Sequence, residues 1–371
     1  MLIAIDASRA NKKHKTGTEW YSFYITQELK KIIPEQHRVI LYSQDQLSEK
    51  LAQLPANWSM KILRWPFKYL WTQGRLVWEM ISKKPDVLFV PAHTIPIIGA
   101  KKTVTAIHDI GFEEFSELYN PLALWYHRFS ALLAKYSASL IIAPSEFTRN
   151  KIIEKYHFDP QKIKVVKLGY NAEIFNKNYD LLETKKTLVK CNVRQPYIIT
   201  VSRLEKKKNI VGLIEAFNIL QKQWPELNLV LVGRPGYGYD EIKAKINQLN
   251  LNNKIIQTGW LSARRIAMLY NEALAFVFPT LYEGFGLPIL EAQACGCPVL
   301  VSNICSCPEV GGNAVLYFDP HNYQEMASKI SQVIESLDLR QDLINKGFEN
   351  IKNYSWVKTA QETWDYMRNL L

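Results

Sequence analysis

The sequence is poor in cysteine and has no long hydrophobic run. Five of its 371 residues are cysteines, a number that fits a compartment where thiols stay reduced. The apolar run at residues 2–5 is followed by Asp6, and no run in the chain approaches the length needed to cross a bilayer. We therefore expect a cytoplasmic protein, with any membrane contact peripheral and at the inner face.

Four of the cysteines form two C-x-C elements, a pattern that can indicate a metal site. Cys295 and Cys297 precede a predicted buried strand at residues 298–301, and Cys305 and Cys307 follow it. Free cysteine often packs in such places as a small hydrophobic side chain. We therefore expect no metal.

Basic residues outnumber acidic ones, 46 to 35, which gives a net charge of +11. This excess indicates an anionic partner, such as nucleotide phosphates, acidic lipid head groups or nucleic acid. The sequence contains no recognisable nucleic-acid-binding module, so we expect no nucleic-acid partner.

The chain is longer than one hydrophobic core usually holds, and 47% of its residues are hydrophobic, so two folded domains are expected. Short β-branched runs alternate with longer amphipathic segments, which predicts an α/β protein with two doubly wound parallel sheets. The predicted strands lie at residues 2–5, 39–42, 87–90, 103–107, 140–143, 164–168, 197–201, 228–232, 254–258, 275–279, 298–301 and 315–318. The polar segment 171–194 is the predicted linker, and a final helix is expected to start near Ser355.

The segment EGFGLPILE, residues 283–291, follows a predicted strand and opens a helix. Gly284 and Gly286 allow the backbone to approach a ligand closely, and a helix amino terminus favours negative charge such as a diphosphate. We expect Glu291 in the first turn of that helix, where its carboxylate can accept hydrogen bonds from two ribose hydroxyls, and Glu283 nearer the sugar. The alternative is an ordinary strand, turn and helix with exposed glutamates.

A second motif, the basic segment SRLEKKKN at residues 202–209, directly follows the predicted strand 197–201. Arg203 can grip phosphate oxygens with two parallel donors and Lys208 adds a compact charge, so the pair can stabilise a leaving diphosphate. The alternative is a solvated basic turn.

Together these motifs resemble glycosyltransferase family 4 (group 1), whose members are retaining enzymes of the GT-B fold. The resemblance is carried by residues 202–209, 283–291 and the PEVG segment 308–311, and in the first half by IHD at 107–109 and APSEF at 143–147.

The resemblance implies two Rossmann-like domains that face each other across an interdomain cleft. Residues 1–178 would form the acceptor domain, 179–354 the nucleotide-sugar donor domain, and 355–371 a helix that returns to the first domain. It also implies front-side transfer without a covalent intermediate, without a metal, and without a cofactor other than the nucleoside diphosphate sugar.

Residue roles follow from the resemblance. Arg203 and Lys208 would hold the donor diphosphate, Glu291 the ribose and Glu283 the sugar. The full set of implied donor-binding residues is Gly17, Arg203, Lys208, Glu283, Gly284, Phe285, Gly286, Leu287 and Glu291.

The implied catalytic residues are Arg203, Lys208, Glu283 and His108. His108, at a strand end in the first domain, would face the transferred sugar; the alternative is a histidine that merely ends a strand. Trp260 and Leu261 would lie near the nucleotide base, which backbone groups would mainly recognise.

The chain departs from the family pattern in two places. In the loop after the first strand, where relatives often carry two glycines, only Gly17 is present, and Glu19 adds bulk and negative charge. We therefore expect this loop to serve the acceptor more than the donor. Cys305 and Cys307 stand where small polar residues are expected, and the sequence offers no function for them.

The stretch between Trp58 and Lys84 mixes aromatic and basic side chains, which can form a surface for an anionic membrane. Its members are Trp58, Trp65, Phe67, Tyr69, Trp71 and Trp78, with Lys61, Arg64, Lys68 and Arg75. The favoured alternative is a core helix with one wet face. In that case one face, with Leu70, Gly74, Val77 and Ile81, packs on the sheet, and another carries Trp71, Arg75 and Trp78.

The sequence therefore predicts a retaining hexosyltransferase that moves a hexose, with mannose from GDP-mannose as a first guess, to a glycan or lipid-linked acceptor in surface polysaccharide assembly. One alternative is a non-catalytic nucleotide-sugar-binding GT-B scaffold protein. Another is a different GT-B enzyme, such as a phosphorylase or a sugar-nucleotide epimerase.

Overall fold

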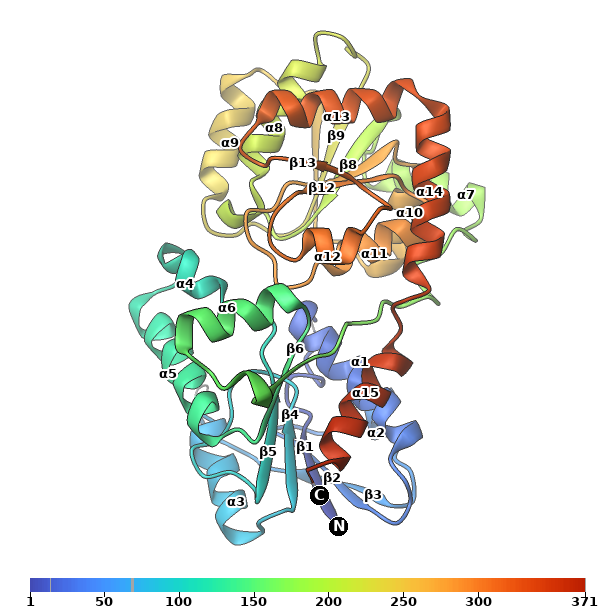
Figure 1. Cartoon of the computed structure of the whole chain (residues 1–371). Coiled ribbons are helices and arrows are strands. Elements are labelled where there is room, and N and C mark those ends of the chain that lie inside the picture. Colours follow the sequence, from blue (N-terminus) through green and yellow to red (C-terminus); the bar gives the residue numbers. More distant parts are fainter. Residues whose placement is uncertain (14, 68–69, 371) are drawn as a thin grey trace. The chain divides into compact units, whose positions relative to one another are not determined.

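The computed structural model describes residues 1–13, 15–67 and 70–370, and the chain divides into two compact units (Figure 1). Unit 1 comprises Met1–Gly169 and Ser355–Leu371, and unit 2 comprises Tyr170–Tyr354. Both match the predicted class, because each unit contains a parallel sheet covered by helices.

The division lies nine residues before the predicted boundary at 178/179. Residues 170–178 belong to unit 2 because they bond to it: Asn271 Nδ2 donates to the carbonyl of Asn176 at 3.0 Å, and the Lys177 ammonium lies 5.8 Å from the Phe348 ring centre. The predicted linker at 171–194 contains a helix, α7 (Leu181–Lys190), and is therefore not a structureless connection.

The sheet of unit 1 has the strand order β3-β2-β1-β4-β5-β6-β7, with all pairs parallel. Its strands are β1 (Leu2–Asp6), β2 (Arg38–Ser43), β3 (Trp58–Ile62), β4 (Val87–Val90), β5 (Lys102–Ala106), β6 (Leu140–Ala143) and β7 (Ile163–Val165). The central strands are buried on both faces, which explains their continuous apolar sequences. β3 was not predicted.

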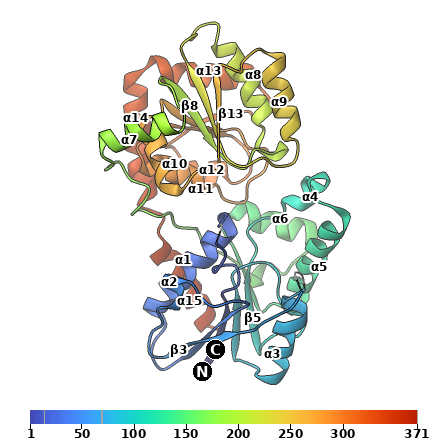
Figure 2. The ribbon, with the colours of Figure 1, turned by 180° about the vertical axis from the view of Figure 1, so that it is seen from behind.

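Helices cover both faces of this sheet. The helices of unit 1 are α1 (Gly17–Ile32), α2 (Glu49–Ala52), α3 (Val77–Ser82), α4 (Gly111–Glu114), α5 (Pro121–Ser137), α6 (Glu146–Tyr156) and α15 (Trp356–Arg368). One hydrophobic cluster packs α3, α5 and α6 on the sheet through residues such as Met80, Ala134 and Ile152. On the other side α15 packs on α1, where the rings of Tyr24 and Trp356 stack 5.2 Å apart (Figure 2).

Local sequence signals explain where several helices begin. Asn120 caps α5 by accepting from the Ala123 amide at 2.8 Å. Ser145 caps α6 in the same way at 3.0 Å, and Ser355 caps the final helix at 3.2 Å. These caps satisfy amide groups that lack partners within the helix.

The sheet of unit 2 has the order β10-β9-β8-β11-β12-β13 and is also parallel. Its strands are β8 (Tyr197–Val201), β9 (Asn228–Val232), β10 (Ile255–Gly259), β11 (Ala275–Phe278), β12 (Val299–Ser302) and β13 (Leu316–Phe318). Besides α7, its helices are α8 (Ile210–Leu220), α9 (Tyr239–Gln248), α10 (Ala263–Glu272), α11 (Leu287–Ala294), α12 (Cys307–Gly311), α13 (Tyr323–Glu335) and α14 (Leu337–Ile351). A core cluster joins α8, α9 and α13 to one face of the sheet.

The stretch between Trp58 and Lys84 does not form a continuous aromatic surface. Trp58 and Trp71 are buried, and Trp71 Nε1 donates to the Leu63 carbonyl at 2.9 Å. Phe67 and Trp78 are exposed, and the predicted members Lys68 and Tyr69 lie outside the described residues.

The faces predicted for the helix in this stretch are also wrong. Leu70 and Ile81 are exposed, whereas Trp71, Leu76 and Met80 are buried. The cause is a π-helical turn at residues 72–76, which shifts the side-chain register ahead of α3, so that a constant period of 3.6 residues misassigns the faces.

Within the described ranges, no helix has both the length and the apolar composition that crossing a bilayer would require.

Candidate functional site

The strand order of unit 2 reverses between β8 and β11, which creates a topological switch point at the carboxyl edge of the sheet. The loops that follow these two strands meet there. The Leu281 amide donates to the Lys207 carbonyl at 2.8 Å, and Thr280 Oγ1 lies 3.3 Å from the same oxygen. The structure therefore brings the two predicted motifs, at 202–209 and 283–291, into direct contact.

Lys208 and Glu283 form an ion pair at this edge. Their side chains are only 12% and 21% exposed, and Lys208 Nζ lies 5.3 Å from the ring centre of Phe278 at the end of β11. The low exposure strengthens the pairing, because water screens it weakly. The ammonium and the carboxylate thus hold each other at the switch point.

Arg203 extends from the same loop into solvent, with 65% of its side chain exposed. Its Nε lies 3.5 Å from Glu205 Oε2, and Lys207 Nζ lies 3.7 Å from the other oxygen of that carboxylate. Glu205 is buried and was not predicted as part of the site. Its place between two cations explains how a run of basic residues stays folded at this edge.

The turn at residues 283–286 is supported from the loop that follows β12. Ser306 is buried, and its Oγ lies 2.9 Å from the Glu283 carbonyl and 3.0 Å from the Phe285 carbonyl. Gly286 has a φ of 102°, which favours glycine, and α11 begins at the next residue, Leu287. The Phe285 side chain is buried, so this residue offers its backbone rather than its ring to the surface.

Glu291 does not lie in the first turn of α11, contrary to the prediction, because it is the fifth residue of a helix that begins at Leu287. Burial raises the pKa of its carboxyl from 4.5 to about 8. No hydrogen bond or ion pair of this carboxyl is found in the part of the chain that the structure describes. It is a partly accessible carboxyl that a ligand with two adjacent hydroxyls would satisfy.

A third loop at this edge, residues 233–238, was not predicted. A Cβ on Gly236 would lie 2.7 Å from Glu205 Cβ, and one on Gly233 would lie 1.7 Å from the Ser202 carbonyl oxygen. The glycines therefore let this loop pack against the Arg203 loop. The sequence signal was the G-R-P-G-Y-G run directly after β9, which is typical of a close backbone approach.

Trp260 and Leu261, predicted near a nucleotide base, follow β10. Trp260 is 54% exposed and Leu261 is buried, so only the tryptophan offers its ring to a ligand. The Arg234 guanidinium lies 5.6 Å from the Trp260 ring centre. Arg234 and Trp260 thus form a cationic and aromatic surface at the outer strands of the sheet.

Three of the four cysteines in the C-x-C elements pack as predicted for small hydrophobic residues. Cys295, Cys297 and Cys307 are buried, and burial raises the pKa of each thiol. Cys305 Sγ lies 3.4 Å from the Leu281 carbonyl, in the loop that presents Ser306 to the turn. Among the described residues, no three His, Cys, Asp or Glu side chains are grouped for metal binding.

In unit 1 the strand order reverses between β1 and β4. His93, in the loop after β4, has its Nε2 3.1 Å from Nδ1 of His127 on α5. Burial, together with the charges of His127 and Arg9, lowers the pKa of His93 to about 3. No local sequence pattern predicts this pair, because its members come from distant segments.

His108 lies near that pair, two residues beyond β5. Its Nε2 is 3.0 Å from the Pro91 carbonyl, so this nitrogen carries the proton, and the Tyr21 ring packs at 4.5 Å. Burial lowers the pKa of His108, which makes a neutral imidazole with Nδ1 as an acceptor.

The loop that leads into α1 is stabilised by Glu19. Its Oε2 accepts from the Thr16 amide at 3.0 Å, and its Oε1 lies 3.4 Å from Arg9 Nη1. Glu19 is therefore a helix-capping residue as well as a local negative charge. A Cβ on Gly17 would meet nothing within 4 Å, so packing does not require glycine there.

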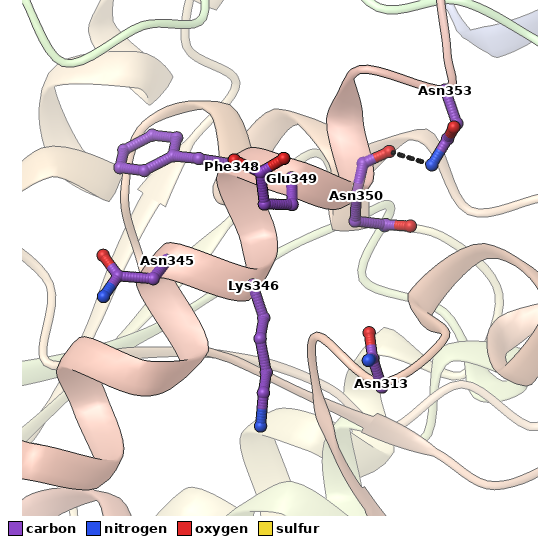
Figure 3. Close-up of a pocket in the computed structure, with 7 residues that line it drawn as sticks. All are labelled: Asn313, Asn345, Lys346, Phe348, Glu349, Asn350 and Asn353. Carbon is purple, nitrogen blue, oxygen red and sulfur yellow. Dashed lines mark hydrogen bonds between the residues drawn. The ribbon is translucent and has the colours of Figure 1, made fainter.

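A surface hollow of about 580 Å³ lies along α14 (Figure 3). Asn313, Asn345, Lys346, Phe348, Glu349, Asn350 and Asn353 line it. None of the predicted site residues is among them.

Two family models match the chain. Residues 16–174 match the model described as Glycosyltransferase Family 4, and residues 184–350 match Glycosyl transferases group 1. The chain is 29% identical to O-antigen chain mannosyltransferase B of Escherichia coli over 294 residues, which is 78% of this chain and 76% of that protein. It is 27% identical to O-antigen chain mannosyltransferase RfbU of Salmonella typhimurium over 310 residues, 81% of either chain.

Solved structures share the whole fold at low identity. Sucrose-phosphate synthase from Thermosynechococcus elongatus superposes with a TM-score of 0.78 at 17% identity, covering 100% of this chain and 99% of its own. HepE of Anabaena, solved with UDP-glucose, gives 0.77 at 18% identity, with 99% of each chain covered. The two parallel sheets, the order of the motifs and the two family models lead to one conclusion: the chain belongs to the GT-B glycosyltransferases of family 4, group 1.

Proposed function

We propose that this protein is a retaining hexosyltransferase that moves mannose from GDP-mannose to a glycan or lipid-linked acceptor in surface polysaccharide assembly. The observation that carries the proposal is the contact between the Arg203–Lys208 loop and the Glu283 turn at the switch point of unit 2. The names of two relatives, both O-antigen chain mannosyltransferases, support mannose as the sugar.

In this proposal the donor diphosphate lies between Arg203, Lys208 and the amides at the start of α11. The bond between sugar C1 and the phosphate oxygen breaks while an acceptor hydroxyl attacks C1 from the same face, and the leaving phosphate oxygen receives the acceptor's proton. The two cations stabilise the charge that develops on the diphosphate. Because Lys208 engages Glu283, that carboxylate is better suited to holding the sugar than to attacking it.

Metal independence is part of the same proposal. The basic pair would take the place of a divalent ion as the source of positive charge at the leaving group. Glu291 would bind the ribose, and Trp260 with Arg234 would border the base. A uridine donor is the main alternative to guanosine, because the related fold of HepE was solved with UDP-glucose.

The acceptor is assigned to unit 1, near His108 and the His93–His127 pair. A neutral imidazole suits a sugar hydroxyl, and His108 keeps Nδ1 as an acceptor because its Nε2 proton is donated to the Pro91 carbonyl. The enzyme would work in the cytoplasm, where nucleotide sugars are the donors, and meet a lipid-linked acceptor at the inner face of the membrane.

The direct test is transfer from GDP-mannose and UDP-glucose to mannose-terminated acceptors in the presence of EDTA, with NMR of the product. We expect an α-linked product from an α-linked donor, without added metal. A β-linked product would refute retention, and activity only with a restored divalent ion would refute metal independence. Nucleotide binding without transfer to any acceptor would favour the scaffold protein, and donor rearrangement without acceptor would favour an epimerase.

A further inference from the structure

Helix α5 carries an apolar stripe that faces solvent. Leu122, Trp125, Leu132 and Tyr136 are 76%, 61%, 44% and 75% exposed. Their spacing of three, seven and four residues places them on one side of the helix. Phe129 completes the stripe, and its ring stacks on Trp125 at 5.5 Å and 8°.

The opposite side of α5 already packs on the sheet through alanines such as Ala131 and Ala134. The exposed stripe is therefore additional to the side that the fold uses. Soluble proteins rarely expose contiguous apolar surface of this kind without a partner.

Further exposed apolar side chains lie on α3, the helix that joins the same hydrophobic cluster and covers the same side of the sheet (Figure 1). Trp78 and Ile81 are 65% and 59% exposed. Ile97 and Ile98, in the segment between β4 and β5, are also exposed. We call these side chains and the α5 stripe together the α5 surface.

Positive charge borders the α5 surface. Lys83 and Lys84 follow α3 directly, Lys102 begins β5, and Lys135 Nζ lies 5.4 Å from the Tyr136 ring centre. The end of α5 lies beside the start of β5, because the Ser139 amide donates to the Thr103 carbonyl at 2.8 Å.

Two acidic groups in this part of unit 1 are paired within the fold, whereas Glu114 and Glu117, ahead of α5, are exposed. Glu113 pairs with Arg128 at 2.9 Å, and Asp86 pairs with Lys101 at 2.7 Å. Lys83, Lys84 and Lys102 form no ion pair with any residue in the described part of the chain. The surface therefore presents apolar and aromatic side chains, with lysines after α3 and at the start of β5 that lack an ion-pair partner among the described residues.

We propose that the α5 surface docks the protein on an anionic lipid bilayer. Leucine and isoleucine can enter the outer part of the hydrocarbon, tryptophan and tyrosine suit the head-group region, and each nearby lysine attracts an anionic leaflet. A second copy of this chain would place like charges opposite each other, which disfavours it as the occupant. The inference rests on the proposed function only in one respect: a lipid-linked acceptor would explain why the enzyme binds a membrane.

The test is sedimentation of the full chain with vesicles of phosphatidylcholine alone and of phosphatidylcholine with phosphatidylglycerol, at low and high salt. We expect binding to the anionic vesicles at low salt and a clear loss at high salt. The Leu122→Gln/Trp125→Gln variant should lower the partition coefficient about tenfold or more. Both side chains are exposed, so folding should be unaffected, which a thermal melt checks.

The matched control is Leu181→Gln/Leu182→Gln on α7 of unit 2. Leu181 is 57% and Leu182 is 60% exposed, and both lie outside the α5 surface. This control should bind vesicles as the wild type does. Equal loss in both variants, no binding of the wild type at low salt, or a dimer in solution that the α5 variant converts to a monomer would each overturn the proposal. Nucleotide binding, measured on the same samples, should be unchanged, so failure of this inference is separable from failure of the proposed function.

Discussion

Replacing Lys208 by methionine separates the structural from the catalytic contribution of its ion pair with Glu283. The pair is largely removed from solvent, with side-chain exposures of 12% and 21%. Removing one member of a fully buried pair costs about 3–5 kcal/mol, because the other charge is left unpaired. Since this pair keeps some contact with water, we expect Lys208→Met to lower the free energy of unfolding by about 1–3 kcal/mol.

The same change should lower kcat/KM by about a hundredfold or more, which corresponds to about 3 kcal/mol of lost charge stabilisation. A second substitution, Glu283→Gln, removes the unpaired charge. In the double variant we therefore expect most of the stability to return, while turnover stays low because the cation at the diphosphate is still absent.

Denaturant unfolding and steady-state release of the nucleoside diphosphate measure the two effects on the same preparations. Lys243→Met is the control, because Lys243 pairs with Asp240 at an exposed position on α9 and should change neither quantity. Recovery of turnover in the double variant would show that Lys208 serves only to neutralise Glu283. An unchanged Lys208→Met protein would refute both assigned contributions.

Three further changes test other parts of the site. Arg203→Ala should lower kcat/KM by about a hundredfold without lowering the thermal midpoint, since the side chain is 65% exposed; kinetics and a thermal melt check this. Gly286→Ala should cost about 1–2 kcal/mol of stability and weaken nucleotide binding in calorimetry, because φ is 102° and the new Cβ would lie 3.0 Å from Ile289 Cδ1. Burial raises the pKa of Glu291 from 4.5 to about 8, so the folded state binds the extra proton in this range. Stability should then fall as pH rises through it, and nucleotide affinity should rise through about pH 8 and level off above it, as the carboxylate that accepts ribose hydroxyls forms. In Glu291→Gln, calorimetry and unfolding at several pH values should show no pH dependence of nucleotide affinity or of stability in this range. A variant whose nucleotide affinity still depends on pH as in the wild type would refute the ribose assignment.

The twelve predicted strands all appear, and the central ones are easily recognised because parallel strands buried on both faces have continuous apolar sequences. β3 was missed because it lies at the sheet edge and its sequence, WSMKI, lacks that pattern. The faces of the segment at 70–81 were misassigned because the sequence does not reveal the π-helical turn that precedes α3.

The meeting of the Lys208 and Glu283 loops at one sheet edge is explained by topology, since both loops come from strands that flank the switch point, but the ion pair itself was not predicted. Glu205 could not be recognised from the sequence as part of the site. It contributes because it is buried and contacts both Arg203 and Lys207, which only the folded loop shows. His93 pairs with His127 through a tertiary contact between the loop after β4 and helix α5. Local residue spacing does not predict such a contact. The helical position of Glu291 was missed by a single residue, because α11 begins directly after Gly286 and its fifth residue falls just beyond the first turn.

The most direct test of the donor site is isothermal titration of GDP and UDP into the wild type and into an Arg203→Ala/Lys208→Met variant, all in EDTA. We expect one nucleotide to bind the wild type with a stoichiometry of one per chain, and the variant to bind it at least about a hundredfold more weakly. Equal affinity in the variant, or no binding of either nucleotide to the wild type, would contradict the assignment of the donor diphosphate to the loops after β8 and β11.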